Sequence, residues 1–252
     1  MTPNEPATPR PASTILLLRD DAAVGLEVFM VERHHKMGFA AAARVFPGGR
    51  VDDTDTSLAD CAENAFRVAA IRETFEESGI LLARPHGSSS LIASDHLKTL
   101  QPARPAVNAG EIKFEDLLKG ENLTLATELL VPFAHWITPV NFPKRYDTHF
   151  FLARAPEDHI GKHDGYESVD SLWISPTRAL TDADAGRGKL EFATRRNLEK
   201  LARWTTTDAA LTTARNAQVV TVLPVLSGPE PDAKATIPTD ADYGGSVFSL
   251  AN

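Results

Sequence analysis

The chain has 252 residues, with 26 Lys and Arg against 34 Asp and Glu, which gives a formal net charge of −8. That balance excludes indiscriminate nucleic-acid binding, which depends on clustered basic residues. Hydrophobic residues make up 42% and charged residues 24%, as in ordinary globular domains, so disorder throughout the chain is excluded as well. No apolar run reaches the roughly 18 residues that a membrane-spanning helix needs. The one cysteine, Cys61, excludes an intramolecular disulfide and favours a reducing, cytoplasmic setting.

The hydrophobic patterns along the chain predict one α+β domain over residues 13–226. Residues 1–12 are rich in proline and are predicted to form a disordered tail. Residues 227–252 combine Pro, Gly and Asp without periodicity, which indicates a second tail, extended or disordered. The polar segment 84–127 is expected to be an insertion. Strands are predicted at 14–18, 26–32, 80–83, 129–138, 146–153, 168–175 and 218–226, and helices near 94–100 and 109–119 and at 176–180 and 191–204.

A longer helix is predicted from Ser57 to Gly79. Ser57 is the expected N-cap, and Gly79 ends the helix as a left-handed C-cap. Val68, Ile71 and Phe75 recur three and four residues apart, which predicts that they form the buried stripe. The other side of the helix is therefore expected to face away from this core.

Three carboxylates of this helix, Glu73, Glu76 and Glu77, fall within an arc of roughly 100° on that other side. Each like-charged pair at this spacing costs on the order of 3 kcal/mol when partly buried and far less when solvated. A bound divalent cation makes the electrostatic free energy of the carboxylate group favourable instead of unfavourable. Hard oxygen ligands of this kind suit Mg²⁺ or Mn²⁺. A solvated acidic face with Arg72 as counter-ion is the simpler interpretation for an isolated E-x-x-E-E. The Gly-Gly turn before the helix and the glycine after it favour the metal site.

With these residues in place, the sequence resembles the Nudix hydrolases, whose box reads G-x5-E-x7-R-E-U-x-E-E-x-G-U, where U is aliphatic. Gly49 and the run RETFEESGI at residues 72–80 match the box, except that Thr74 stands at the first U. The resemblance implies a Nudix-type α/β/α sandwich with a mixed β-sheet, a helical insertion and C-terminal helices.

The spacing inside the box departs from the pattern. Arg72 follows Gly49 by 23 residues where the pattern has 14, so an insertion of nine residues is expected, roughly over 52–60. Counting back from Arg72 places the intermediate Glu of the pattern on Asn64, with Glu63 beside it.

The flanks of the box resemble the branch that contains the peroxisomal acyl-CoA diphosphatases, over roughly residues 14–204. The similar stretches are VERHHKMGFAAAARVFPGG, RETFEESGILLARP and HWITPVNFPKRYDTHFFLA. Arg33 matches the arginine-rich upstream element of other CoA diphosphatases, whereas Gly38 stands at its second Arg position. Residues 249–252 read SLAN rather than S-K-L, so a peroxisomal address is not expected.

The resemblance implies hydrolysis of a nucleoside diphosphate linked to another moiety, by attack of water on a phosphorus, with Mg²⁺ or Mn²⁺ as cofactor. The implied catalytic residues are Glu73, Glu76, Glu77, Arg72 and Glu167. The implied metal ligands are Glu73, Glu76 and Glu77, together with the backbone of Gly48 and Gly49. The implied substrate-binding residues are Arg33, Arg50, Lys144, Arg145 and Tyr146.

Simpler interpretations stay open for several of these residues. The two glycines could form a plain turn, Glu167 could be a solvated loop carboxylate rather than an extra ligand or base, and residues 144–146 could be a charged turn before a strand. His34 and His35 are adjacent and no H-E-x-x-H occurs, so the sequence does not predict a zinc site.

CoA or acyl-CoA is the favoured substrate, with 3′,5′-ADP and 4′-phosphopantetheine or its acyl form as products. Within the same class, ADP-ribose or a dinucleotide is the alternative. From another class, the alternative is a catalytically silent ligand-binding module, which would be expected to lose box carboxylates. The expected partner is a small nucleotide-type molecule, without nucleic acid or membrane, in the cytoplasm, and a homodimer stays open.

Overall fold

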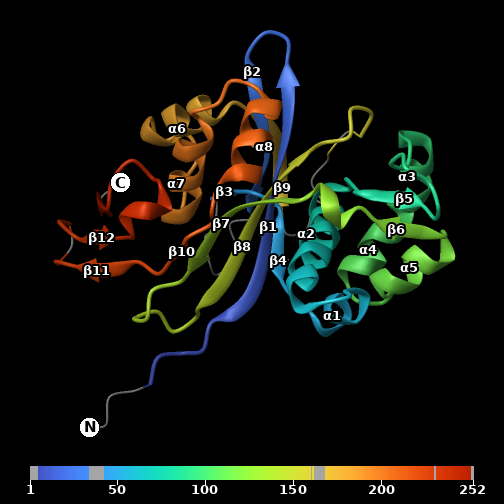
Figure 1. Ribbon diagram of the computed structural model, residues 1–252, viewed down its shortest axis with the longest axis horizontal. Coiled ribbons are helices and arrows are strands. Elements are labelled where there is room, and N and C mark those ends of the chain that lie inside the picture. Colours follow the sequence, from blue (N-terminus) through green and yellow to red (C-terminus); the bar gives the residue numbers. More distant parts are fainter. Residues whose placement is uncertain (1–4, 34–42, 160, 162–167, 230, 251–252) are drawn as a thin grey trace.

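The computed structural model describes residues 5–33, 43–159, 161, 168–229 and 231–250. Within them, an eight-stranded sheet lies between two layers of helices (Figure 1). Its strands are β1 (Arg10–Asp21), β2 (Gly25–Arg33), β3 (Arg44–Val45), β4 (Gly48–Arg50), β7 (Val131–Ile137), β8 (Tyr146–Arg154), β9 (Ser168–Ile174) and β10 (Thr221–Val222). Their order is β10-β7-β8-β1-β2-β3, with β4 paired to β1 and β9 to β2. Because β1 runs parallel to β8 and antiparallel to β2, the predicted α/β/α sandwich around a mixed sheet is confirmed.

The long strand β1 brings Gly48 and Gly49 of β4, here called the glycine loop, to the centre of the sheet. One edge of β1 pairs with β8, and its other edge pairs first with β4 and then with β2. Gly49 is opposite Ser13, and its neighbour Gly48 is opposite the next residue of β1. Because pairing with β2 begins only at Leu18, the first half of β1 is available to the glycine loop.

The disordered tail predicted over residues 1–12 is wrong for its last part, because β1 begins at Arg10. The Arg10 N–H donates a hydrogen bond to the Arg145 carbonyl at 2.9 Å. The Arg145 Nη1 donates to the Ala7 carbonyl at 2.8 Å. These contacts with the start of β8 order the segment, and no periodicity in a proline-rich stretch would reveal them.

The helix predicted from Ser57 is two helices, α1 (Asp53–Leu58) and α2 (Ala62–Ser78). The predicted N-cap is wrong, because the chain turns into α1 earlier, where the Asp55 carboxylate accepts a hydrogen bond from the Asp52 N–H at 2.8 Å. A short break then separates the two helices.

The other features predicted for this helix are confirmed. Gly79 ends α2 in the left-handed region, with φ +73°, and donates its N–H to the Phe75 carbonyl. Val68, Ile71 and Phe75 are all buried.

The side of α2 that was expected to face away from the core is also covered. Figure 1 shows the insertion lying beside α2. Its apolar side chains, among them Leu100 and Phe114, join the same core as Phe75. Glu76, whose carbonyl bonds to Arg104 of the insertion, and Glu77, which faces β4, retain only 8% and 6% of their exposure.

The insertion is more regular than the sequence suggests. The helix predicted over 94–100 has those bounds, whereas the one predicted over 109–119 begins only at Phe114. The strand predicted over 80–83 is shifted: residues 80–82 are buried without strand pairing. The elements of this region are β5 (Ala83–Pro85), α3 (Ser94–Leu100), η1 (Gln101–Ala103), α4 (Arg104–Asn108), α5 (Phe114–Gly120), β6 (Leu123–Leu125) and η2 (Thr127–Leu129).

The opposite face of the sheet carries α6 (Pro176–Asp184), α7 (Phe192–Leu201) and α8 (Thr207–Asn216). The first two match predicted helices, and the core candidates Leu198 and Leu201 are fully buried, whereas α8 was not predicted. None of the helices in the described part of the chain is long and apolar enough to cross a membrane.

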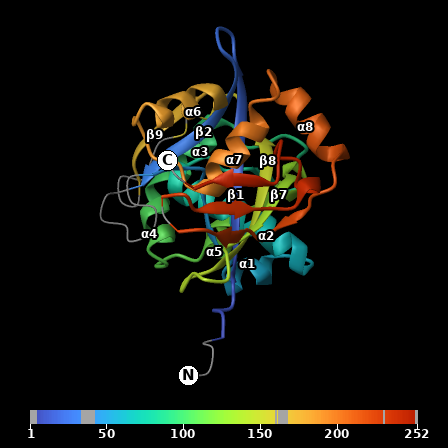
Figure 2. The same ribbon diagram turned by 90° about the vertical axis from the view of Figure 1, so that its left-hand side faces the viewer.

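The C-terminal tail, predicted to be extended or disordered, is folded in its described residues. It contains β11 (Val225–Ser227), β12 (Lys234–Thr236), η3 (Thr239–Ala241) and β13 (Val247–Ser249). The three strands form a small sheet on the α7 side of the molecule, seen in red in Figure 2. The strand predicted over 218–226 is divided between β10 and β11 by Pro224, which has no N–H to donate.

Tyr243 is one of the buried side chains that anchor this tail, together with Ile237 and Ala241. Tyr243 keeps 6% of its exposure, and its Oη accepts a hydrogen bond from Trp136 Nε1 and donates one to Asn197 Oδ1, both at 2.8 Å. Burial is the main reason that the pKa of Tyr243 lies well above its usual range. The buried residues of the tail are irregularly spaced, which is why no sequence periodicity reveals them.

Candidate active site

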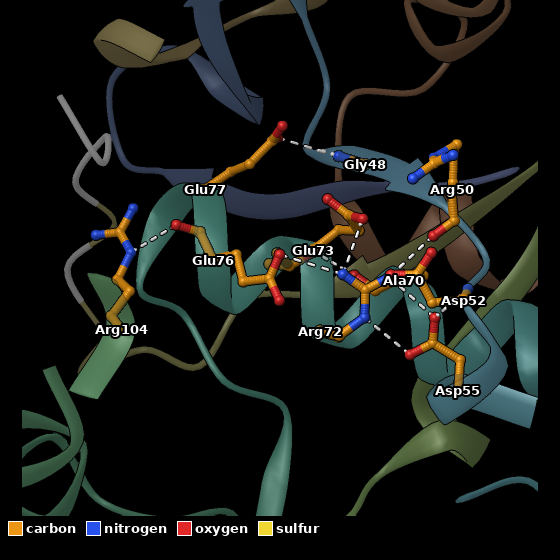
Figure 3. Close-up of polar contacts among 11 residues, drawn as sticks. Gly48, Arg50, Asp52, Asp55, Ala70, Arg72, Glu73, Glu76, Glu77 and Arg104 are labelled. Atoms are coloured by element: carbon orange, nitrogen blue, oxygen red, sulfur yellow. Dashed lines mark hydrogen bonds and ion pairs between the residues drawn. The ribbon is translucent and has the colours of Figure 1, made fainter. Parts of the chain in front are cut away.

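Strand β4 lies against both β1 and the second half of α2 (Figure 3). The Glu77 Oε2 accepts a hydrogen bond from the Gly48 N–H at 3.1 Å. A Cβ on Gly49 would lie 2.4 Å from the carboxyl carbon of Glu73, and one on Gly48 would lie 2.3 Å from the Ser13 carbonyl oxygen. Only glycines therefore allow β4 to approach β1 and the Glu73 carboxylate this closely.

Arg72 is the centre of the polar network (Figure 3). Its Nη1 donates to Glu73 Oε1 at 2.9 Å and to Glu76 Oε2 at 3.1 Å. On its other side, Nε and Nη2 form a two-pronged pair with Asp55 at 2.8 and 2.9 Å, and Nη2 also donates to the Arg50 carbonyl at 2.8 Å. Burial alone would lower the pKa of Arg72, but the surrounding carboxylates outweigh it and raise that pKa. The guanidinium thus stays charged and fixes the Glu side chains.

Asp55 is the site residue that sequence reasoning missed. Its side chain is fully buried, and both of its oxygens accept hydrogen bonds from Arg72. Asp55 stands six residues after Gly49, which is the G-x5-E spacing of the box, with Asp in place of Glu. Counting forward from Gly49 would have found it.

The expected position of the box insertion is therefore corrected. The nine extra residues follow Asp55 and precede Arg72, instead of occupying 52–60. Asn64, expected at the intermediate acidic position, donates to a carboxylate of the preceding turn. Glu63 beside it keeps 73% of its side-chain exposure.

Glu76 is held from two sides, by Arg72 at its carboxylate and by Arg104 at its backbone. Its backbone carbonyl accepts a hydrogen bond from Arg104 Nε at 2.7 Å, which ties the insertion to α2. Burial raises the pKa of Glu76 to about 7, the charge of Arg72 opposes this rise, and the charge of Glu73 adds to it. The carboxylate is consequently poised between its neutral and charged forms near neutral pH.

This donor set suits a hard divalent cation. Asp55, Glu73 and Glu76 each accept a hydrogen bond from the Arg72 guanidinium, and Glu77 faces the Gly48 N–H nearby, so negative charge is in excess. Carboxylate oxygens are the ligands that Mg²⁺ and Mn²⁺ prefer. Because Gly49 has no Cβ, the β4 backbone passes directly beside the Glu73 carboxylate. The carboxylates concerned are Asp55, Glu73, Glu76 and Glu77.

The structure does not place every predicted site residue. Glu167 and Gly38 lie outside the described residues. Arg33 is the last residue of β2, and its side chain is outside the described set. Arg50 is exposed at the end of β4, and its side chain points away from the Arg72 guanidinium (Figure 3).

The second predicted substrate-binding group, residues 144–146, is at the start of β8. The Arg145 guanidinium is buried, and its Nε donates to the Thr138 carbonyl at 2.9 Å in addition to its bond with Ala7. Lys144 is exposed, and Tyr146 is half-buried. The Arg145 side chain thus holds backbone carbonyls of its own chain, and the structure does not bring it to the box carboxylates.

Comparison with known proteins agrees with the fold and the box. The model of the NUDT19 Nudix domain family matches residues 59–187, just over half of the chain. A NUDIX hydrolase from Alicyclobacillus acidocaldarius has a solved structure that superposes with a TM-score of 0.67, at 27% identity, over 81% of this chain and 96% of its own. The chain therefore belongs to the Nudix hydrolases, and among them to the NUDT19 Nudix domain family.

The chain is also similar to two curated animal proteins. Nudix hydrolase 7 of Caenorhabditis elegans is 32% identical over 160 residues, which cover 64% of this chain and 50% of that protein. The acyl-coenzyme A diphosphatase NUDT19 of Xenopus laevis is 28% identical over 206 residues, which cover 62% of this chain and 54% of that protein. The chain thus spans about half the length of these relatives.

Proposed function

We propose that the protein hydrolyses the diphosphate of CoA or acyl-CoA, with Mg²⁺ or Mn²⁺, to give 3′,5′-ADP and 4′-phosphopantetheine or its acyl form. The observation that carries the proposal is that Glu73 and Glu77 lie against the two glycines of β4, while Arg72 bonds to both Glu73 and Glu76. The substrate is favoured by relatives whose name is acyl-coenzyme A diphosphatase.

Glu73, Glu76 and Glu77 are the residues that would hold the metal. When bound, the cation would neutralise phosphate oxygens and lower the pKa of the attacking water. Arg72 fixes the carboxylates of Glu73 and Glu76 before substrate arrives, so little reorganisation is needed at the site. Asp55 holds Arg72 in turn.

The reaction needs one water and no further reactant. The water oxygen forms a bond to one phosphorus, the bridging P–O bond breaks, and the bridging oxygen leaves with the other phosphate. The water proton passes to a base, for which Glu167, outside the described residues, is a candidate.

A substrate screen tests this proposal. The parent protein with Mg²⁺ is incubated with CoA, acyl-CoA, ADP-ribose, NADH and diadenosine polyphosphates, and the products are separated by chromatography. We expect 3′,5′-ADP to form from CoA or acyl-CoA with the highest kcat/KM. A much higher kcat/KM for ADP-ribose would favour the alternative diphosphatase, and cleavage of none of them would favour the silent binding module.

The extra phosphate of CoA gives a sharper test. Arg33 ends β2, next to the segment that leads to the glycine loop, and a guanidinium there can bind phosphate oxygens in a two-pronged way. We expect Arg33→Ala to reduce kcat/KM for CoA more than for dephospho-CoA. Arg154→Ala, at the far end of β8, removes the same charge and serves as control. Equal losses for both substrates in Arg33→Ala would contradict this assignment.

A further inference from the structure

Two histidines and an aspartate meet on adjacent strands, away from the box. His135 of β7 is directly opposite His149 of β8, and Asp147 lies two residues from His149, so all three side chains share one face of the sheet. One potential ligand atom from each lies within 4.8 Å of the others, and all three residues are half-buried. None of the box residues belongs to this cluster.

The two ring nitrogens of His135 face different oxygen atoms. Its Nδ1 lies 2.8 Å from the Thr221 hydroxyl on β10, and its Nε2 faces the Asp147 carboxylate at hydrogen-bond distance. Histidines that bind metals commonly use one ring nitrogen for the ion and donate the other N–H to an oxygen. Thr221 can accept that N–H; Nε2 then has a lone pair toward Asp147, and a cation between the two acceptors would remove their repulsion.

His149 completes the group with a second imidazole. Its ring centroid lies 4.2 Å from that of His135 and 4.1 Å from the ring of Phe66 on α2. A neutral imidazole has a lone pair available for a metal ion.

We propose that His135, Asp147 and His149 bind a divalent transition-metal ion of the Zn²⁺ or Co²⁺ class, separately from the box metal. Two imidazoles with one carboxylate suit Zn²⁺, Co²⁺ or Ni²⁺ better than Mg²⁺, which prefers oxygen ligands. Three protein ligands leave at least one position of the ion open to water or another molecule. Phe66 and Glu73 are seven residues apart on α2, so the two sites are separated by about 10 Å along this helix.

The sequence does not predict this site, because no contiguous motif contains it. The ligands come from two strands, and only the register between β7 and β8 brings them together. The competing interpretation is a plain His135–Asp147 ion pair, with His149 stacked beside it and no role for a metal.

Titration with Co²⁺ distinguishes these interpretations, because its visible absorption reports on the ligands. The titration is done in the Glu76→Gln background, which weakens the box site. We expect about one equivalent of Co²⁺ to bind with an absorption band that His149→Gln and the isosteric Asp147→Asn each remove. Thr221→Val should retain the band and weaken binding by about tenfold.

The matched control is His96→Gln, which breaks a surface His–carboxylate pair with Glu121, and it should leave the titration unchanged. Circular dichroism of each variant shows that it is folded. An absent band in the Glu76→Gln parent, or an unchanged band in folded Asp147→Asn and His149→Gln, would overturn the proposal and leave the ion pair.

Discussion

Two buried polar networks, one on each face of the central sheet, differ in their net charge. On the α2 face, Arg72 is surrounded by several carboxylates, and the charge there is unbalanced. On the α7 face, the buried polar chain from Trp136 through Tyr243 to Asn197 is neutral. An excess of buried negative charge makes one face sensitive to cations and protons, whereas the neutral chain only adds stability. Metal ions, pH and substitutions should therefore act differently on the two faces.

The largest effect on folding is expected from Arg72→Met on the α2 face. This change leaves Asp55 buried without its partner and returns the Glu side chains to mutual repulsion. Breaking a buried ion pair in this way costs about 3–5 kcal/mol. Urea unfolding in the absence of metal measures it. A loss below about 1 kcal/mol would show that the network contributes little to stability.

Two neighbouring glycines sharpen the comparison within the α2 face. Gly49→Ala places its Cβ against the Glu73 carboxylate, which can swing away, so folding should be kept while kcat falls about 100-fold. Gly48→Ala meets the Ser13 backbone instead and should cost roughly 1–3 kcal/mol of unfolding free energy. Paired kinetics and urea unfolding of both variants check this. The same stability loss in both would contradict it.

Proton and metal should compete at Glu76. Its pKa is raised to about 7 in the folded protein, against 4.5 ordinarily, so without metal this group makes stability fall as pH rises from about 4.5 to about 7. Mg²⁺ binds the charged form, so its increase of the Tm should be larger at pH 8 than at pH 6. Scanning calorimetry with and without Mg²⁺ measures this, and a pH-independent increase would argue against Glu76 as a ligand.

The smallest effect is expected on the α7 face. Tyr243→Phe removes one hydroxyl from the buried neutral chain and should cost about 1 kcal/mol of unfolding free energy. It should change neither the Mg²⁺-induced shift of the Tm nor kcat/KM. A changed metal response in Tyr243→Phe would mean that the two faces are coupled.

Local patterns account for what the sequence predicted. The spacing of Val68, Ile71 and Phe75 and the Gly79 cap depend only on helix geometry, so the end and the buried face of α2 could be read directly. Helix geometry also predicts, from the run Arg72 to Glu77, that the box carboxylates share one side of α2. What surrounds them, including the insertion that covers α2, depends on contacts between distant segments.

Three structural features were not predicted from local sequence patterns. Asp55 was missed because the box spacing was counted from Arg72, on the wrong side of the extra residues. Tyr243 helps to anchor a tail whose buried residues, among them Ile237 and Ala241, follow no helix or strand period. His135 and His149 are opposite each other only because of the strand register, which the sequence did not specify.

The central claim is that the box carboxylates hold a divalent cation on which hydrolysis depends. The most direct measurement is the Tm of the parent and of Glu76→Gln, with and without Mg²⁺, alongside turnover of CoA. Mg²⁺ at about 100 times its Kd should stabilise the parent by about 2.7 kcal/mol. We predict that Glu76→Gln loses most of this stabilisation and reduces turnover by orders of magnitude. A Glu76→Gln protein that keeps both its activity and its Mg²⁺ response would contradict the account.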